Sequence, residues 1–434
     1  MASLVPGEST RIDSNGGLTE RGAEILRTAD RLFVTRGYTA TTMNDLAEAT
    51  GILPGSLYHH FPSKESVAVA LLEAFNDDVH ALPSTLRGAG LLDHSPEARL
   101  RELSKALAVI GSRHPAAVRL RGIMPPSSAS ERFQRAVDYR PTGMYRLWHQ
   151  AASELSELPG VTATDPTLLA FGLQSLSITA SAHADGSTSM EEVADLNCDL
   201  LLYGICRDTR PDSEFDRAPS LAAVRRAVKQ WHRPAFEGDQ TRIDILAAAR
   251  QIFASRGYAN TTIRDIAHLS GVHMGTIYRR FDSMQDIYTE IIEGFSRHLH
   301  DTMMTALTSA PDDIPATIDA AAFSIAQINR MFREETTIMS EAWIREAPDE
   351  TVTHQAFIAR VDERLTHLTE LIVKGQNEGV VTCELPAPVI SRELRQILWL
   401  RYHQRDRASA RRIQYFARNH LLRGVMERPA GTGN

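Results

Sequence analysis

Apolar and polar positions near the start of the chain alternate with the period of amphipathic helices. Apolar residues stand at 25, 26, 29, 32 and 33, a spacing that puts them on one face of a helix. Gly37 follows where a C-terminal cap is expected. Thr42 and Asp45 then have the spacing of a capping box. A second helix of about eight residues is therefore predicted to end at Gly51.

A third short helix is predicted to carry Tyr58 and to reach Phe61, and Ser63 is placed to cap a fourth, longer helix. Two short helices joined by a glycine-containing turn form a helix-turn-helix. The second helix of that motif normally enters the major groove of DNA. The pattern therefore predicts an all-α fold with a DNA-binding motif near the start of the chain.

The same pattern occurs again at a constant offset of 220 residues. Residues 25–75 and 245–295 align without a gap and share 18 identities in 51 positions. The second copy repeats the capping box as Thr262 and Asp265, and the following glycine as Gly271. The period is far too long for a solenoid. It indicates that a module of about 200 residues has been duplicated.

Both copies resemble the N-terminal domain of TetR-family transcriptional regulators, through the pattern RGY-x-x-TT-x-x-D-x-A-x-x-x-G-x-x-x-G-x-x-Y-x-x-F-x-S. Family members normally carry one such domain, followed by a helical ligand-binding and dimerisation domain. The resemblance therefore implies two tandem TetR-like units, each with a helix-turn-helix domain and a helical regulatory domain. The implied divisions are 18–75 and 76–206 for the first unit, a linker at 207–239 with one short helix at 219–231, and 240–295 and 296–426 for the second unit.

Position in the family pattern also implies which side chains contact DNA. Asn44 and Arg264 lie where the helix before the recognition helix can reach a base, and their chemistry favours adenine and guanine, respectively. The residues implied to contact DNA are Thr42, Asn44, Leu53, Ser56, Tyr58, His59, His60 and Lys64 in the first copy, and Thr262, Arg264, His273, Thr276, Tyr278, Arg279 and Arg280 in the second. Each of them alone is also compatible with a solvated surface position, and the two tyrosines with packing.

Net charge at first argues against DNA binding, because the chain carries -7 and has a pI near 6.2. The first helix-turn-helix region, 18–80, has a net charge of -4, and the second, 238–300, a net charge of 0. The second region nevertheless gathers Arg264, Arg279 and Arg280 at the expected DNA edge. We therefore expect the second domain to supply more of the phosphate-binding energy than His59 and His60 supply in the first.

Charge also suggests how the two units pair. By resemblance, the dimerisation helices fall within 165–206 and 385–426, which carry net charges of -6 and +7. Opposite charge favours the mixed pair and like charge disfavours self-pairing, so an intrachain pseudo-dimer is predicted. Unlike recognition helices on such a pseudo-dimer predict an asymmetric operator. Two independently solvated faces are the alternative, and a further homodimer of chains stays open.

The regulatory domains contain candidate residues for an effector pocket. A small hydrophobic effector is an expected partner by resemblance only. Aromatic residues of the two regulatory domains either line its pocket or form plain core: Phe133, Tyr139, Tyr145, Trp148, Phe323, Phe332 and Trp343. No phosphate-binding loop, dinucleotide fingerprint, GxSxG or HExxH motif is present, so no enzyme, cofactor or metal is expected.

The sequence also leads to expectations about the location of the protein and about its function. The three cysteines lack CxxC spacing, and neither a membrane span nor a signal region is evident, so a cytoplasmic protein without membrane contact is expected. The favoured function is a ligand-responsive, sequence-specific DNA-binding regulator, most often a repressor in this family, with double-stranded operator DNA as its partner. The alternative is a helical small-molecule or protein-binding module whose helix-turn-helices have lost DNA binding.

Overall fold

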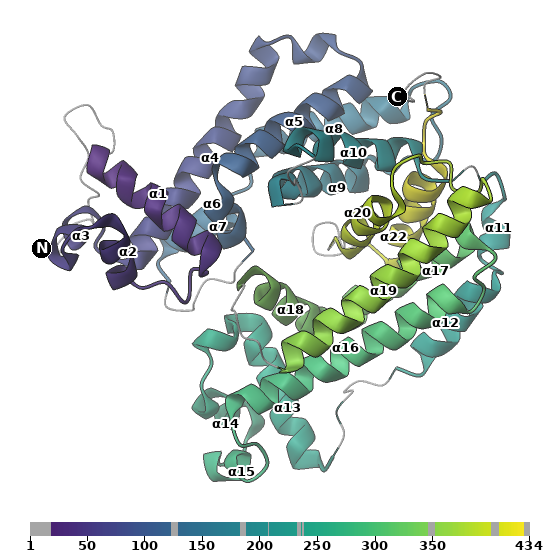
Figure 1. The fold of residues 1–434 in the computed structure, drawn as a ribbon. Coiled ribbons are helices and arrows are strands. Elements are labelled where there is room, and N and C mark those ends of the chain that lie inside the picture. Colours follow the sequence, from purple (N-terminus) through teal and green to yellow (C-terminus); the bar gives the residue numbers. More distant parts are fainter. Residues whose placement is uncertain are drawn as a thin grey trace, which may run out of the picture.

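The structure of the protein is a computed structural model. It describes residues 19–122, 129–182, 188–206, 208–231, 236, 238–345, 352–400 and 408–428. Helices make up the regular structure of these ranges, together with an isolated antiparallel bridge between Cys206 and Val381. The all-α prediction is therefore confirmed. Figure 1 shows two arms that diverge from a common base where helices of both halves of the chain meet.

The arm formed first along the chain, α1 to α10, is called the first unit here. Its helices are α1 (Glu20–Thr35), α2 (Met43–Thr50), α3 (Pro54–His60), α4 (Lys64–Gly88), η1 (Leu91–Asp93), α5 (Pro96–Arg113), α6 (Pro115–Leu120), α7 (Glu131–Asp138), α8 (Thr142–Ser156), α9 (Pro166–Thr179), η2 (Ala180–Ala182) and α10 (Met190–Tyr203). α5 lies at the centre of the regulatory helices and packs on α8, α9 and α10. α4 joins this bundle to the helix-turn-helix by packing on α6, α7 and α8.

The remaining helices form the second unit. They are α11 (Asp212–Phe215), α12 (Pro219–Lys229), α13 (Gln240–Arg256), η3 (Tyr258–Asn260), α14 (Ile263–Ser270), α15 (Met274–Tyr278), α16 (Met284–Thr308), α17 (Ile314–Met331), α18 (Arg333–Arg345), α19 (Val352–Asn377), α20 (Ala387–Trp399), α22 (Ala410–Phe416) and the π-helix η4 (Ala417–Arg423). α12 packs along α16 and α17. The described part of 207–239, expected as a linker, thus contributes a helix to the packing of the second unit.

The predicted caps of the helix-turn-helices are present in both copies. Thr42 and Thr262 form capping boxes with the aspartates three residues on. α2 ends at Gly51 with φ 65°, and α14 ends at Gly271 with φ 71°. Because the left-handed region disfavours side chains with a Cβ atom, glycine suits both ends. Ser63 likewise caps α4.

Most of the aromatic side chains considered for a pocket lie in the cores. Phe133 and Trp148 are fully buried in the first unit, and Phe323 and Phe332 are buried in the second. Tyr139 lies at the edge, where its hydroxyl is 2.6 Å from Nδ1 of His80. The side chain of Trp343 lies outside the described residues. The buried four therefore stabilise the folds of their bundles.

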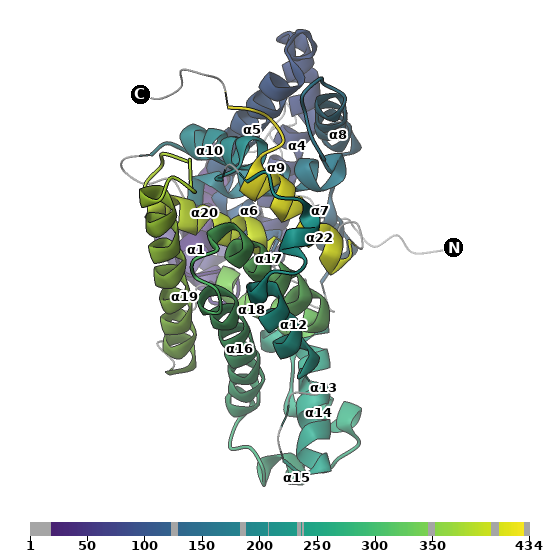
Figure 2. The ribbon, with the colours of Figure 1, turned by 90° about the vertical axis from the view of Figure 1, so that its right-hand side faces the viewer.

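The two units meet through the helices at their C-terminal ends, which lie between the arms in Figure 2. α10 packs on η4, and α9 contacts α20. Backbone hydrogen bonds cross the junction: the Cys206 N–H donates to the Leu422 carbonyl at 2.8 Å, and the Met426 N–H donates to the Leu202 carbonyl at 3.0 Å. Under the 220-residue offset these two bonds are equivalent. Residues at equivalent positions of the two units therefore exchange backbone hydrogen bonds in both directions across the junction.

Two glycines at equivalent positions face each other at this junction. Gly204 has φ 63° and Gly424 has φ 73°. A Cβ atom on Gly204 would lie 2.3 Å from the backbone nitrogen of Gly424. A Cβ atom on Gly424 would lie 2.3 Å from the carbonyl carbon of Tyr203. The closeness of the two backbones therefore depends on the absence of side chains at both positions.

The charge argument for pairing is only partly met. Asp165 of the acidic window pairs with Arg412 of the basic one at 2.7 Å. Asp199, however, pairs within its own unit, with Arg101 of α5 at 2.6 Å. Residues 183–187 and 401–407 of the two windows lie outside the described residues. The net charge of a window counts all of its side chains, whereas each side chain forms an ion pair only with the helix that its own face contacts.

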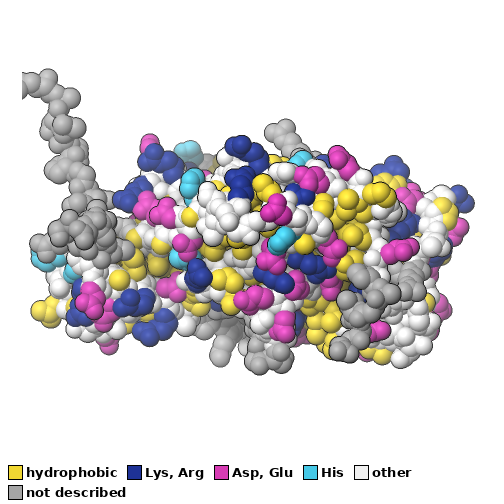
Figure 3. All heavy atoms as spheres, turned by 90° about the horizontal axis from the view of Figure 1, so that it is seen from above, with side chains coloured by type: hydrophobic (Ala, Val, Ile, Leu, Met, Phe, Trp, Pro, Cys, Tyr) yellow, Lys and Arg dark blue, Asp and Glu magenta, His cyan; other side chains and the backbone are white. Residues whose placement is uncertain are grey.

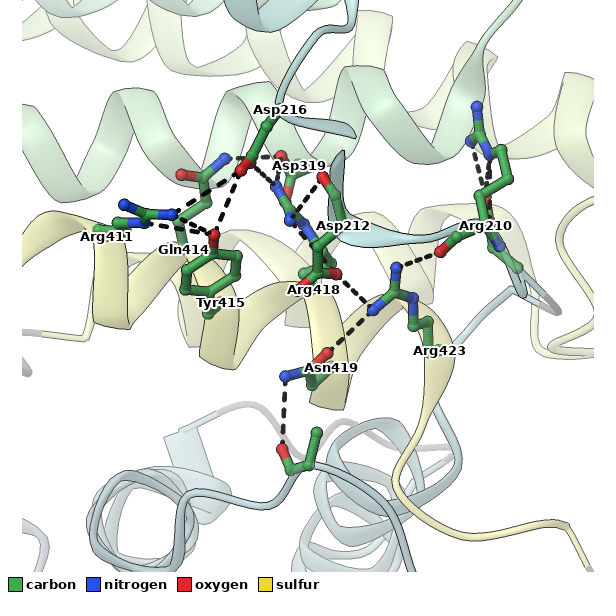
Figure 4. A network of polar contacts seen from close by, with 12 residues as sticks. Arg210, Asp212, Asp216, Asp319, Arg411, Gln414, Tyr415, Arg418, Asn419 and Arg423 are labelled. Atoms are coloured by element: carbon green, nitrogen blue, oxygen red, sulfur yellow. Dashed lines mark hydrogen bonds and ion pairs between the residues drawn. The ribbon is translucent and has the colours of Figure 1, made fainter. Parts of the chain in front are cut away.

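Arginines of the basic window instead build a network with the segment that connects the two units (Figure 4). Arg418 is fully buried and donates from Nε to Asp319 at 2.9 Å and from Nη2 to Asp216 at 3.0 Å. Asp319 of α17 is 1% exposed. Phe215 of α11 lies against the Arg418 guanidinium, 4.8 Å from ring centre to Cζ. The network ties η4 to the connecting segment and to α17.

A histidine, His420, is buried at the junction between the two units. His420 Nδ1 lies 2.9 Å from the Leu201 carbonyl, and Nε2 accepts the Asp165 N–H at 3.3 Å. The ring must therefore be neutral, with its proton on Nδ1. Burial lowers the pKa of His420 from 6.5 to about 4, although Asp165 opposes the shift.

We expect this group to contribute about 3 kcal/mol of stability that is present above pH 6.5 and is lost as the pH falls towards 4. The sign follows because the unfolded chain binds a proton in this window and the folded chain does not. Urea unfolding of the wild type and of His420→Gln between pH 7 and pH 4 measures it. The difference in unfolding free energy between the two should shrink as the pH falls. Parallel pH profiles would contradict the expectation.

Candidate nucleic-acid interface

The motif residues shared by both copies hold the helix-turn-helix in shape. The hydroxyl of Thr41 donates to the Gly37 carbonyl at 2.8 Å, and that of Thr261 donates to the Gly257 carbonyl at the same distance. Arg36 lies 3.4 Å from Asp45, and Arg256 and Asp265 repeat the pair at 3.6 Å. Much of the family pattern therefore consists of residues that stabilise the helix-turn-helix, because these side chains make their contacts within it.

In the first unit, the recognition helix α3 presents an exposed face. Leu57 points inward and is fully buried, whereas Leu53 is 79% exposed and Tyr58 49%. Ser56 and His59 are exposed as well. The exposed face also includes Thr42 and Asn44 of the preceding helix start, and His60 is half-buried. An apolar side chain as exposed as Leu53 is costly in water, and a thymine methyl is one partner that would cover it.

Lys64 has a role that its position in the family pattern did not reveal. Its Nζ donates to the carbonyls of Tyr38 and Thr41 at 2.8 Å each, and to that of Thr39 at 3.2 Å. Nζ also lies 4.5 Å from the centre of the Tyr38 ring. Burial lowers the pKa of Lys64. An ammonium has three donors, so all of them are committed to the loop before α2, and a phosphate contact requires giving one up.

In the second unit, no lysine holds the loop that corresponds to the one bound by Lys64. Met284 stands at the equivalent position and is packed against the core. The hydroxyl of Tyr258 donates to Gln285 at 3.0 Å, and its ring lies 5.0 Å from that of Tyr288. The departure from the family pattern at Met284 is thus matched by new contacts of the neighbouring loop.

The recognition helix of the second unit, α15, is more cationic. Arg264, His273 and Arg279 are exposed, and Thr276 and Arg280 are half-buried. The exposed face also carries Thr262 of the α14 cap, Leu269, Met274 and Tyr278. Leu269 at the end of α14 also exposes an apolar side chain, as Leu53 does, and no position of the family pattern marks it.

The two arginines at the end of α15 differ in their surroundings. Arg279 Nη2 donates to the Thr276 hydroxyl at 3.1 Å, which holds an exposed guanidinium on the recognition face. Arg280 pairs with Asp239, the N-cap of α13, at 2.8 Å, and its carbonyl accepts from Arg242. Arg280 therefore anchors the helix-turn-helix scaffold, and of the two only Arg279 points a largely uncommitted charge outward.

The face of the molecule seen from above carries charges of both signs. Viewed from above, Lys and Arg side chains are interspersed with Asp and Glu (Figure 3). Within the described ranges, no three His, Cys, Asp or Glu side chains gather as a metal site. No described helix combines the length and apolar character needed to cross a bilayer. The two exposed recognition faces are features of the described chain that fit nucleic acid.

A family model for bacterial regulatory proteins of the tetR family matches residues 25–71 and 245–291. The chain therefore carries two TetR-type helix-turn-helix domains in tandem. The matched segments coincide with the two helix-turn-helix domains, so the predicted duplication of this module is confirmed.

Known transcriptional regulators are similar to a short part of this chain. The HTH-type transcriptional repressor KstR2 of Rhodococcus jostii is 46% identical over 79 residues, which are 18% of this chain and 39% of that protein. The HTH-type transcriptional regulator TtgR of Pseudomonas putida is 39% identical over 70 residues, 16% of this chain and 31% of that protein. The chain thus spans well under half the length of these relatives. The solved structure of KstR2 of Mycobacterium tuberculosis matches with 20% identity and a TM-score of 0.38, covering 41% of this chain and 91% of that one.

Proposed function

We propose that the chain is a sequence-specific transcriptional regulator that binds operator DNA as an intrachain pseudo-dimer. The observation that carries the proposal is the pair of capped helix-turn-helices, each with an exposed recognition face. The first-unit face centres on Leu53 and the second-unit face on Arg279. The similar proteins include transcriptional repressors, which favours repression as the sign of regulation.

The junction supports the pseudo-dimer. Equivalent backbone hydrogen bonds cross it in both directions, and Gly204 and Gly424 bring the two chain segments to backbone contact. Such a self-complementary contact is how a two-fold dimer forms between separate chains. Here the connecting segment joins the partners covalently, so their pairing does not depend on protein concentration.

Differences between the recognition faces support an asymmetric operator. The first presents an amide at Asn44, an apolar side chain at Leu53 and a hydroxyl at Ser56, whereas the second presents Arg264 and His273. Asparagine pairs best with adenine and arginine with guanine. Two unlike half-sites, about one helical turn or a multiple of it apart, are therefore expected.

Site selection from random duplexes with the full chain tests this proposal. One chain per duplex on two unlike half-sites is the expected result, with affinity that falls steeply with salt. A perfect inverted repeat bound by two chains would contradict the pseudo-dimer but keep DNA binding. No salt-dependent binding to any duplex, including the intergenic DNA beside its gene, would favour instead a helical ligand- or protein-binding module.

The second domain is expected to supply more of the phosphate energy. Alanine in place of Arg279 should weaken operator binding about tenfold, because a hydrogen bond to a charged group contributes about 1.5–3 kcal/mol. It should also reduce the slope of log K against log salt concentration by about one, the share of one phosphate contact. His59→Ala is the matched control, because His59 is exposed at the equivalent position of α3. An equal or larger loss for His59→Ala would overturn the assignment.

The proposal also includes the DNA-contacting residues, the domain divisions, the location and the effector that the sequence predicts. The helix-turn-helix residues implied by the family pattern are proposed to contact DNA, with Lys64 and Arg280 acting mainly on the scaffold for the reasons given. The divisions at 18–75, 76–206, 207–239, 240–295 and 296–426 are proposed as the domains. A cytoplasmic location, a small effector bound in a regulatory domain and the absence of an enzymatic activity belong to the same proposal.

A further inference from the structure

Two helices at equivalent positions, α8 and α19, pack differently in the two units. Under the 220-residue offset, α4 corresponds to α16, α5 to α17, and α8 to residues 362–376 of α19. α8 packs on α5, the central helix of the first regulatory bundle, whereas α19 packs mainly on α16 and α20. The central helix of the second bundle, α17, is nevertheless buried over almost its whole length. Another element must therefore cover it.

The segment that connects the two units supplies this cover through α12. Leu221 and Val224 of α12 are fully buried, and α12 packs along both α16 and α17 (Figure 1). The Ser220 hydroxyl is also buried and donates at 3.0 Å to a backbone carbonyl in the first turn of α17. Near the middle of α17, the ring centre of Phe323 lies 5.7 Å from the guanidinium carbon of Arg225. α12 is therefore a helix of the second bundle.

Beyond α12, the connecting segment reaches the region where the second helix-turn-helix joins its bundle. Trp231 packs edge-on against Phe332, with 5.4 Å between the ring centres. Phe332 in turn lies 5.8 Å from Phe295 of α16. The Phe236 ring lies 5.1 Å from the guanidinium of Arg250 on α13, and α13 packs on α14 and α16. The connecting segment therefore contacts both the bundle and the first helix of the DNA-binding domain.

The other end of the connecting segment is held at the junction between the units. Arg210 pairs with Asp313, the N-cap of α17, at 2.8 Å. Asp216 accepts a hydrogen bond from Arg418 of η4 at 3.0 Å. α16 is one continuous helix of 25 residues that packs on α13 at the helix-turn-helix and on α12 and α17 in the bundle. The segment thus links the base of the second arm to the helix that carries its tip.

We propose that α12 acts as a brace that fixes the position of the second helix-turn-helix relative to the junction. Pairing at the junction fixes only the bases of the arms, so the distance between the recognition helices also depends on how rigidly each arm is held. α12 gives the second arm this rigidity, because it packs on α16 and α17 and its segment is tied to the junction. The brace belongs to the free protein and is tested without DNA, so its failure would leave the proposed DNA binding untouched.

Spin labels on the two arms test the brace, because they report the distribution of distances between the arms. Glu48 and His268 are exposed at equivalent positions of α2 and α14, and the three native cysteines are buried. The pair Glu48→Cys and His268→Cys therefore gives one label on each arm. In this background, Val224→Asp puts a charge on the buried face of α12 and should displace the helix. The distance distribution should become at least about twofold wider, while amide exchange in α1–α5 stays unchanged.

Arg226→Asp is the matched control, because it introduces the same residue on the exposed side of α12. It should leave the distribution as narrow as in the labelled protein without it. Trp231→Ala removes only the contact with Phe332 and should widen the distribution by a smaller amount, so it decides the question if Val224→Asp fails to fold. An unchanged width in the variants that fold would overturn the proposal and make α12 a packed linker only.

Discussion

Arg418→Ala is expected to lower the free energy of unfolding by about 3–5 kcal/mol, the cost of breaking a buried ion pair from one side. Arg418 is fully buried and Asp319 is 1% exposed. Without the guanidinium, the Asp319 carboxylate still accepts a hydrogen bond from the Gln414 amide at 2.6 Å, but no buried cation balances its charge. The variant also loses the contacts of Arg418 with Asp216 and with the Phe215 ring.

Urea denaturation followed by circular dichroism measures this effect. Arg411→Ala is the control on the same helical segment. The Arg411 side chain is 73% exposed, and its ion pair with Asp216 is long, at 3.9 Å. This control should change stability by less than about 0.5 kcal/mol. The double variant Arg418→Met with Asp319→Leu should recover most of the loss, since apolar pairs can replace a buried ion pair. A loss below 1 kcal/mol for Arg418→Ala would show that the network is not a major support of the junction.

Gly424→Ala is expected to open the junction between the two units and to cost at least about 3 kcal/mol. Gly424 has φ 73° and ψ 151°, a conformation essentially limited to glycine. An added Cβ would lie 2.3 Å from both the carbonyl carbon and the oxygen of Tyr203. These are backbone atoms, so the clash is relieved only by moving η4 away from α10.

Small-angle scattering and limited proteolysis within 199–218 report the opening directly. The control is Gly88→Ala at the end of α4, where a Cβ meets nothing within 4 Å and alanine favours the helix by about 1 kcal/mol. Operator binding supplies a second readout, because separated arms place the two recognition helices independently. A Gly424→Ala protein with wild-type scattering and stability would refute the assigned role of the glycine contact.

The helix-turn-helices could be predicted from the sequence in detail because their contacts are local. Thr42 and Asp45 are three residues apart, and Gly51 ends α2 a few residues later, so each cap depends on neighbours that the sequence itself places together. The same holds for Thr262 and Asp265. Exposure of Leu53 could also be expected, because it precedes a helix whose buried residue is Leu57.

Side-chain roles with distant partners could not be predicted in this way. Lys64 binds carbonyls more than twenty residues away, and Arg280 pairs with an aspartate 41 residues away. Both look like phosphate ligands when only their position in the motif is known. Their occupied donors follow from how α4 and α13 cross the loops beside them.

By itself, the sequence determined the duplicated helix-turn-helices, their caps and the all-α class, since short-range spacing and helical periodicity suffice for each. Only the tertiary structure decided which charges meet. The acidic and basic windows contact each other, yet Asp199 pairs with α5 and Arg418 with Asp319. The reason is physical: Coulomb attraction at contact range depends on which helix faces touch and on how deeply they are buried, and neither is contained in a net charge summed along the chain.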